Sequence, residues 1–157
     1  MFIGQTERVY LVAESLKVLI IEDNLDDCEL LIRDLKKDGW DLYYRRIDTK
    51  KAMLEALKEP WDIIISDFTM PQFSGLAALE TLHTTGLDIP FIIVSGTIGE
   101  EAAVEVMRAG ASDYVLKSRR DRLMLAIRRE LEASKRRYKN LATEKALKDT
   151  EEQLRHM

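Results

Sequence analysis

Five short apolar stretches alternate with stretches of helical periodicity along most of the chain. A strand buried on both faces of a parallel sheet needs a continuous apolar run, whereas an amphipathic helix repeats apolar residues every three to four positions. The alternation therefore predicts an α/β fold in which helices cover both faces of a parallel sheet. The predicted strands are Lys17–Glu22, Asp41–Ile47, Trp61–Ser66, Pro90–Ser95 and Asp113–Leu116.

Glycine and proline mark the ends of the intervening helices. Gly39 and Gly86 stand where a helix usually ends in a left-handed residue, and Pro60 cannot continue a helix. Asp48 and Thr49 are suitable caps for the second helix. The predicted helices are Asp26–Asp38, Lys50–Glu59, Gly75–Thr85, Gly99–Ala109, and one from Arg119 to the end of the chain. The strand Asp41–Ile47 is more polar than the others, so we expect it at an edge of the sheet.

Composition places the chain among soluble globular proteins. Apolar residues make up 46% and charged residues 33% of its 157 residues, which is ordinary for a globular domain. No apolar run approaches the roughly 18 residues of a membrane span, and the N-terminus lacks a signal-peptide core. The single cysteine, Cys28, excludes an internal disulfide and fits a reducing cytoplasm. Its place on the apolar stripe of a predicted helix indicates a core position.

Charge is unevenly distributed along the chain. Residues 1–116 carry 11 basic and 21 acidic side chains, and residues 117–157 carry 13 and 7. A basic tail can indicate nucleic-acid binding. Here the charges alternate in sign along one long helix, which favours a solvated helix face instead.

Acidic side chains follow two of the predicted strands. Glu22 and Asp23 follow Val18–Ile21, and Asp67 follows Ile63–Ser66. Ligands bind beyond the carboxyl ends of strands in open parallel sheets, so we expect these three carboxylates at one edge. Like charges so close together repel, and the site needs a proton or a cation. Mg²⁺, a hard ion that prefers oxygen ligands, meets that need.

Two further polar side chains stand at the ends of later strands. Ser95 ends one apolar run, and Lys117 follows Tyr114-Val115-Leu116. A hydroxyl and an ammonium group at this edge are suited to holding a phosphoryl oxygen, and Asp67 is a candidate nucleophile toward phosphorus. Ser95 or Lys117 alone is a weak indication of function. In this order the set predicts a site that handles a phosphoryl group.

From Leu16 to Glu132 the chain resembles the receiver domain of two-component response regulators. The motifs that carry the resemblance are Ile21-Glu22-Asp23-Asn24, Ser66-Asp67-Phe68-Thr69-Met70-Pro71, Val94-Ser95-Gly96 and Asp113-Tyr114-Val115-Leu116-Lys117. The resemblance implies a flavodoxin-like, doubly wound sheet of five parallel strands in the order 2-1-3-4-5, with an extended C-terminal helix.

The resemblance also implies a phosphoacceptor and a metal site. Asp67 would be phosphorylated by the phosphohistidine of a histidine kinase or phosphotransfer domain, and would later lose the phosphate by autodephosphorylation. Mg²⁺ would be held by Asp23, Asp67 and the backbone carbonyl of Thr69, with Glu22 acting mainly through water.

The remaining motif residues would respond to the phosphoryl group. Ser95 and Lys117 would hold it, and Tyr114 would be an aromatic switch that turns inward on activation. Ser118 stands where the family usually has proline after a cis peptide bond. Because a cis bond before a non-proline residue costs about 3–4 kcal/mol, the reach of Lys117 depends on how this peptide is built. Glu22 also replaces the more common aspartate.

The last helix is too long to serve only as the final helix of the domain. Its apolar stripe runs in steps of three and four residues through Leu123, Ile127, Leu131, Ser134, Tyr138 and Leu141. Leu147 and Leu154 continue a seven-residue spacing, shifted by about one residue. A partner helix would cover such a stripe, which predicts a homodimer. The alternative is a solvated linker.

We therefore expect an N-terminal extension (1–15), a receiver domain (16–132) and a helical linker (133–157) to a missing output domain. The tail resembles linkers in sensor histidine kinases, and similar linkers precede PAS-type sensor domains and diguanylate cyclases. This predicts a fragment of a larger signalling protein such as a hybrid kinase. The alternative function is a receiver-like interaction and dimerisation module that works without phosphorylation.

Overall fold

Five parallel strands form one sheet in a computed structural model that describes residues 13–97 and 99–156. The strand order is β2-β1-β3-β4-β5, the order that the family resemblance implies. The more polar β2 lies at one edge, as expected. The strands are β1 (Glu14–Ile21), β2 (Trp40–Ile47), β3 (Ile63–Asp67), β4 (Phe91–Ser95) and β5 (Asp113–Leu116).

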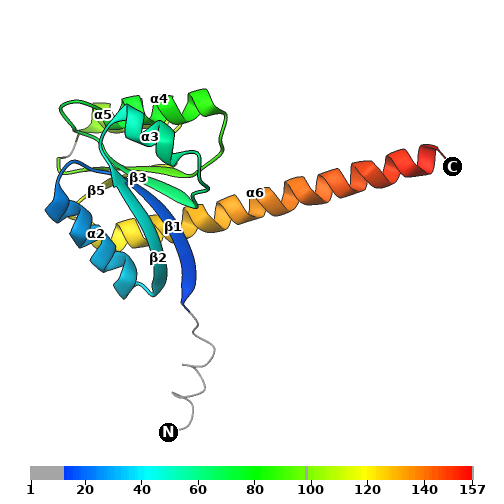
Figure 1. Ribbon diagram of the computed structural model, residues 1–157, viewed down its shortest axis with the longest axis horizontal. Helices are drawn as coiled ribbons and strands as arrows, with labels where there is room; N and C mark the ends of the chain where they lie inside the picture. The colour runs from blue at the N-terminus through cyan, green and yellow to red at the C-terminus, as the bar shows by residue number, and fades with distance from the viewer. Residues whose placement is uncertain (1–12, 98, 157) are drawn as a thin grey trace, which may run out of the picture.

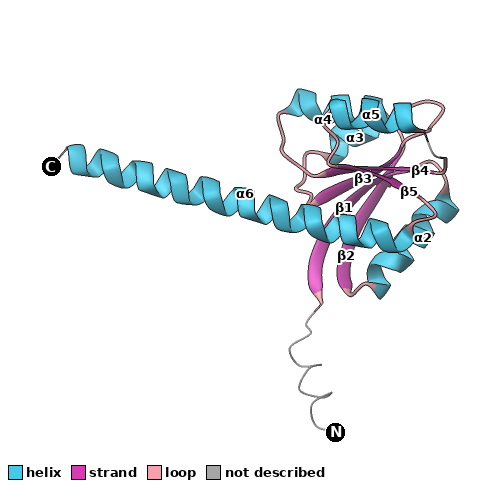
Figure 2. Ribbon diagram, turned by 180° about the vertical axis from the view of Figure 1, so that it is seen from behind, coloured by secondary structure: helices cyan, strands magenta, loops and turns pink. Residues whose placement is uncertain are grey.

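Helices cover both faces of this sheet (Figure 1). They are α2 (Leu25–Lys37), α3 (Lys50–Ala56), α4 (Gly75–Thr85), α5 (Glu100–Arg108) and α6 (Arg120–Arg155). Helices α3, α4 and α5 lie over one face, and α2 and the first part of α6 lie over the other (Figures 1 and 2). Residues alternate between the two faces along β1: Leu19 and Ile21 belong to the first core, and Val18 and Ile20 to the second.

Local signals in the sequence set most of the helix ends. The side-chain oxygens of Asn24, Thr49 and Ser74 accept hydrogen bonds from backbone N–H groups in the first turns of α2, α3 and α4. These bonds satisfy donors that the helix itself leaves without a partner. After α4, Gly86 adopts a left-handed conformation with φ of 72°. The α4 bounds match the prediction at both ends.

Trp61 accounts for errors in the predicted bounds of two elements. We expected it in a strand that follows a helix reaching Glu59, but α3 ends at Ala56 and β3 begins at Ile63. The indole Nε1–H of Trp61 donates to the backbone oxygen of Ala56 at 2.8 Å. The Ala56 oxygen also accepts from the Glu59 N–H at 3.2 Å, so the indole adds a second bond at the helix end. Trp61 therefore packs against the end of α3 and does not extend the sheet.

The first strand begins earlier than the sequence indicates. β1 starts at Glu14, within the predicted extension 1–15, and pairs with β2 along its full length. The rest of that extension, residues 1–12, lies outside the described residues. Cys28 is buried in the core between α2 and the sheet, as predicted.

The apolar stripe of α6 is divided between two environments, which corrects our expectation of one dimerising seam. Leu123, Ile127 and Leu131 are buried against the sheet at 7%, 0% and 8% exposure. Tyr138 and Leu141 are 77% and 63% exposed. The first half of the stripe therefore belongs to the core of the domain, and the second half projects beyond it (Figure 1).

Helix α6 is also attached to α2 by two arginines. Arg120 contacts both carboxylate oxygens of Asp34. Arg128 donates to a carboxylate oxygen and the backbone oxygen of Asp38, at 3.0 and 2.7 Å, and its guanidinium lies 4.8 Å from the centre of the Trp40 ring. Paired donors of this kind fix orientation as well as distance. The start of α6 is therefore held firmly on the domain.

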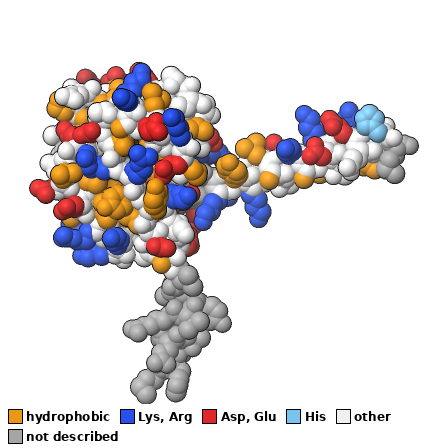
Figure 3. All heavy atoms as spheres, in the orientation of Figure 1, with side chains coloured by type: hydrophobic (Ala, Val, Ile, Leu, Met, Phe, Trp, Pro, Cys, Tyr) orange, Lys and Arg blue, Asp and Glu red, His pale blue; other side chains and the backbone are white. Residues whose placement is uncertain are grey.

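The projecting part of α6 is polar. Figure 3 shows side chains of both charge signs along it, with hydrophobic side chains between them. Within the part of the chain that the structure describes, no helix is long and apolar enough to cross a membrane.

We predict that Ile127→Ala and Leu125→Ala differ sharply in stability. Ile127 is fully buried, and its truncation should lower the free energy of unfolding by about 2–5 kcal/mol because it leaves a cavity. Leu125 is 64% exposed on the same helix, and its truncation should cost about 0.5 kcal/mol or less. Urea unfolding followed by circular dichroism measures both. Equal losses would show that α6 does not pack on the sheet as described.

Candidate functional site

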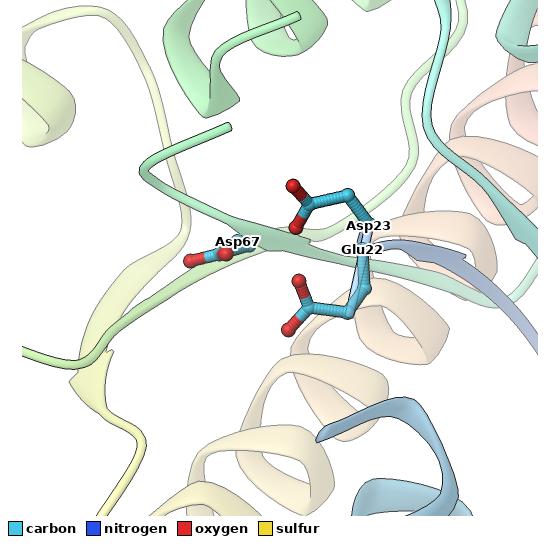
Figure 4. A group of neighbouring side chains, drawn as sticks. All are labelled: Glu22, Asp23 and Asp67. Atoms are coloured by element: carbon cyan, nitrogen blue, oxygen red, sulfur yellow. The ribbon is translucent and has the colours of Figure 1, made fainter. Parts of the chain in front are cut away.

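Three carboxylates meet at the carboxyl edge of the sheet. Glu22 and Asp23 directly follow β1, and Asp67 is the last residue of β3. Because β1 and β3 are neighbouring parallel strands, both strand ends reach the same place. A carboxylate oxygen from each residue lies within 4.8 Å of the others. Figure 4 shows the three side chains converging on one space beside the end of β3.

Burial makes this cluster electrostatically unfavourable without a cation. Glu22 is 4% and Asp67 7% exposed, whereas Asp23 is exposed. Burial raises the pKa of the Glu22 carboxyl to about 7; the hydrogen bond from Lys117 opposes that rise, and the charge of Asp67 adds to it. The negative charge of Glu22 is thus costly at neutral pH, and a bound cation would offset that cost.

Lys117 supplies a positive charge to the site. It directly follows β5, and its Nζ lies 2.6 Å from Oε1 of Glu22 and 3.3 Å from Oδ2 of Asp67. Burial alone would lower the pKa of Lys117, but the hydrogen bonds to Asp27 and Glu22 hold that pKa above its usual value. The ammonium group is therefore charged and stands next to the carboxylate of Asp67.

The departure at Ser118 does not keep Lys117 from the site. None of the peptide bonds in the described residues is cis, so Lys117 precedes Ser118 through a trans bond. The backbone N–H of Lys117 donates to the oxygen of Ser95 at 2.8 Å, which ties the end of β5 to the end of β4.

Ser95 and Tyr114 both bond to one backbone carbonyl. The Oγ of Ser95 donates to the oxygen of Thr97 at 3.1 Å, and the hydroxyl of Tyr114 donates to the same oxygen at 3.2 Å. The Tyr114 ring also meets the Phe68 ring edge to face, with centroids 6.3 Å apart. The loop after β4 thus links two residues that the sequence places 19 positions apart.

The loop after β3 lies against the start of α4. The Phe68 N–H donates to the oxygen of Val94, and the Gly75 N–H donates to the oxygen of Phe68. Thr69, whose carbonyl the family resemblance assigns to the metal, lies in this loop two residues after Asp67. A Cβ atom on Gly75 would stand 2.7 Å from the backbone oxygen of Asp67. Only glycine permits this approach.

The structure adds two residues that sequence reasoning missed. Oδ2 of Asp27 lies 2.7 Å from Nζ of Lys117, closer than Asp67 does. The sequence favours Asp27 as a residue of the helix cap, because acidic residues are common in the first turn of a helix. Thr97 contributes through its backbone carbonyl, which no side-chain pattern reveals.

The donor set suits a hard divalent cation. All three groups are carboxylates, and the ligands of one Mg²⁺, at about 2.1 Å from the ion, lie within roughly 4.2 Å of one another. The 4.8 Å span of the cluster is close to that limit. Small side-chain rotations would close it, so the residues present fit Mg²⁺.

Comparison with known proteins agrees with this geometry. The family model for the response regulator receiver domain matches residues 18–128. This chain belongs to the response regulator receiver domain family. Receiver domains take phosphoryl groups from histidine kinases and generally bind Mg²⁺ at an acidic pocket.

Curated relatives of this receiver domain include transcriptional regulators. The transcriptional regulatory protein ZraR of Escherichia coli K12 is 27% identical over 66% of this chain and 23% of its own length. The cell cycle transcriptional regulator CtrA of Caulobacter vibrioides is 28% identical over 65% of this chain and 44% of its own length. The matched region is therefore less than half of each of these relatives.

Solved structures of receiver domains have the same fold. FixJ-N is 28% identical with a TM-score of 0.65, covering 74% of this chain and 94% of that structure. The signal receiver domain of a signal transduction histidine kinase from Syntrophus aciditrophicus is 26% identical with a TM-score of 0.65, covering 77% and 93%.

We predict that Gly75→Ala disturbs the loop that follows Asp67. The added methyl group would collide with the Asp67 backbone oxygen, so the free energy of unfolding should fall by about 1–3 kcal/mol. Gly96→Ala is the matched control, because a Cβ atom there meets nothing within 4 Å. Urea unfolding measures both variants. A Gly75→Ala protein as stable as Gly96→Ala would contradict the close approach.

Proposed function

We propose that this receiver domain is a phosphoacceptor in a two-component phosphorelay, with Asp67 as the phosphorylated residue. One observation carries the proposal: the nearly buried carboxylate of Asp67 converges with those of Glu22 and Asp23, and the Lys117 ammonium lies 3.3 Å from it. The donor would be the phosphohistidine of a kinase or phosphotransfer domain, as for receiver domains generally.

The transfer itself is a nucleophilic substitution at phosphorus. An oxygen of Asp67 forms a bond to phosphorus while the bond from phosphorus to the donor imidazole breaks, and the electron pair of that bond stays on the imidazole nitrogen. The product is an acyl phosphate. Lys117 is placed to offset negative charge on the phosphoryl oxygens, because its Nζ already lies next to Asp67.

Glu22, Asp23, Asp67 and the carbonyl of Thr69 would hold Mg²⁺. When bound, the ion would offset charge on the carboxylates and the phosphoryl group. The convergence of the three carboxylates at the strand ends supports Glu22, Asp23 and Asp67, and the family resemblance supports Thr69. The raised pKa of Glu22 supports the assignment further, because it shows that nearby positive charge does not fully stabilise the ionised carboxylate.

Ser95 and Tyr114 would respond to phosphorylation together. To donate to a phosphoryl oxygen, the hydroxyl of Ser95 must leave the oxygen of Thr97, which also accepts from Tyr114. The loop that carries Thr97 is then free to shift, and Tyr114 to change rotamer. Because this loop precedes α5 and β5 precedes α6, the change reaches the elements on which an output depends.

We assign the output to residues 133–155 of α6, which lie within the predicted linker 133–157 and pair with a second copy. Helical geometry places Leu147 about 160–200° around α6 from the buried Ile127, so Leu147 faces away from the sheet. Leu154, seven residues on, returns to the face of Leu147 within roughly 20°. Both side chains are more than 60% exposed. A partner helix on this face would not collide with the domain.

The first test of this function is phosphorylation at Asp67. Incubation with acetyl phosphate and Mg²⁺ should add one phosphoryl mass, detected by intact-protein mass spectrometry, and Asp67→Ala should lose it because the nucleophile is gone. Asp26→Ala, which removes an exposed carboxylate of the same region, is the control and should label like the wild type. Equal labelling of Asp67→Ala would refute the assignment, and no labelling of the wild type would favour the phosphorylation-independent interaction module.

The metal site predicts a linkage between Mg²⁺ and stability. At about 100 times its dissociation constant, Mg²⁺ should raise the free energy of unfolding by about 2.7 kcal/mol. Asp23→Ala should remove most of this gain, because it deletes a ligand, while Asp26→Ala should keep it. Beryllofluoride, an acyl-phosphate mimic, should bind only when Mg²⁺ is present. Calorimetry and thermal unfolding report these values, and tight beryllofluoride binding in chelator would disprove the site.

The linker assignment predicts that Leu147→Asp weakens self-association far more than Leu141→Asp. Both leucines are 63% exposed, but only Leu147 lies on the face opposite the sheet. Beryllofluoride should change the dimer dissociation constant of the wild type about 5- to 150-fold, the usual range of allosteric coupling. Alternatively, it should change the distance between spin labels placed at Leu154 of the two copies. Sedimentation equilibrium measures the constant. If neither quantity moves, the output does not run through α6.

A further inference from the structure

Lys117 is held by one carboxylate more than the metal and phosphoryl chemistry requires. Its Nζ has two short contacts, 2.6 Å to Glu22 and 2.7 Å to Asp27, while Asp67 lies further away at 3.3 Å. Asp27 does not belong to the carboxylate cluster around the space beside β3. The ammonium group in this structure is therefore bound most closely to groups other than the phosphoacceptor.

The position of Asp27 is fixed by the fold. It lies in the first turn of α2, where its backbone N–H donates to Oδ1 of Asn24 at 3.0 Å. Its side chain is 42% exposed but reaches inward to Lys117, whose side chain is 26% exposed. The neighbouring Asp26 has the same charge in the same helical turn, is exposed, and takes no part in the ion pairs of Lys117.

Space for the ammonium to move lies directly beside it. A cavity of about 60 Å³ is lined by Glu22, Asp27, Cys28, Asp67 and Lys117, among other residues. Lys117 therefore borders empty space that a displaced side chain can use. What keeps it between Glu22 and Asp27 is electrostatic attraction and the two hydrogen bonds.

We propose that Asp27 is a positioning residue that competes with the phosphoryl group for Lys117. The proposal rests on the proposed function at Asp67. A phosphoryl group on Asp67 needs the ammonium as a counter-charge, and Lys117 must then give up at least part of its contact with Asp27. Asp27 thereby weakens the phosphorylated state relative to the resting state, and holds the lysine in place while the phosphoryl group is absent.

Removing the charge of Asp27 should release Lys117. In Asp27→Asn with saturating Mg²⁺, the dissociation constant of beryllofluoride should fall by roughly two- to fivefold, the amount that a partly exposed charged pair commonly contributes. Asp26→Asn makes the same charge change one residue away without touching Lys117. The change in its dissociation constant measures the effect of losing one negative charge near the site. Any larger change in Asp27→Asn measures the competition for Lys117. Isothermal titration calorimetry gives both constants.

A second measurement needs neither metal nor phosphoryl group. Acetylation of Lys117 by acetic anhydride in chelator, followed by peptide mass spectrometry, should be faster in Asp27→Asn than in the wild type and in Asp26→Asn. A purely structural role of Asp27 would raise acetylation at many lysines and lower the unfolding temperature together. Faster acetylation at Lys117 alone, with an unchanged unfolding temperature, supports the proposal that Asp27 positions Lys117.

The two measurements separate the possible outcomes. If wild type fails to bind beryllofluoride with Mg²⁺, the proposed function fails, while the acetylation rates still decide whether Asp27 holds Lys117. If Lys117 is acetylated faster in Asp27→Asn but the beryllofluoride dissociation constant equals that of Asp26→Asn, Asp27 does not compete with the phosphoryl group. If Lys117 is acetylated at equal rates in Asp27→Asn and Asp26→Asn, Asp27 does not position Lys117 either.

Discussion

The balance of charge around Asp67 is the constraint on which the site depends. The order of the sheet brings β1 and β3 together, and with them three carboxylates that repel one another in a partly buried place. Lys117 arrives from β5, at the opposite edge of the sheet from β2, and its ammonium reaches Glu22 and Asp67. One ammonium group does not neutralise three carboxylates. The resting site therefore keeps an excess of negative charge, which is what makes a divalent cation favourable there.

The hydrogen bonds beside this cluster connect it to the rest of the domain. Ser95 and Tyr114 come from the ends of β4 and β5, and they share the backbone oxygen of Thr97. One carbonyl that accepts from both residues makes their positions interdependent: a new partner for Ser95 changes the surroundings of Tyr114. The aromatic contact with Phe68 extends this dependence to the loop after β3, which directly follows Asp67. Asp67, Ser95 and Tyr114 thus lie within one continuous set of contacts.

Patterns in the sequence predicted the alternation of elements, the edge position of β2 and the convergence of Glu22, Asp23, Asp67 and Lys117 at one edge, because these follow from apolar runs and from the direction of parallel strands. They did not predict that Trp61 would close α3, since a buried Trp next to apolar residues reads as part of a strand. They also could not divide the stripe of α6, because Ile127 and Leu141 have the same periodicity and only the extent of the sheet decides which one is covered.

Helix α2 links the charge cluster to the long helix. Its first turn carries Asp27, which holds Lys117, and further along it Asp34 pairs with Arg120, in the first turn of α6. Asp38, at the end of α2, binds Arg128 two turns further along α6. Lys117 itself stands only three residues before α6 begins. A displacement of Lys117 toward a phosphoryl group would therefore act on α6 by two routes, through the short backbone connection and through the contact with α2. Both routes end in the first turns of α6. A small change in the angle between these turns and the sheet would therefore become a larger displacement at the projecting end of the helix.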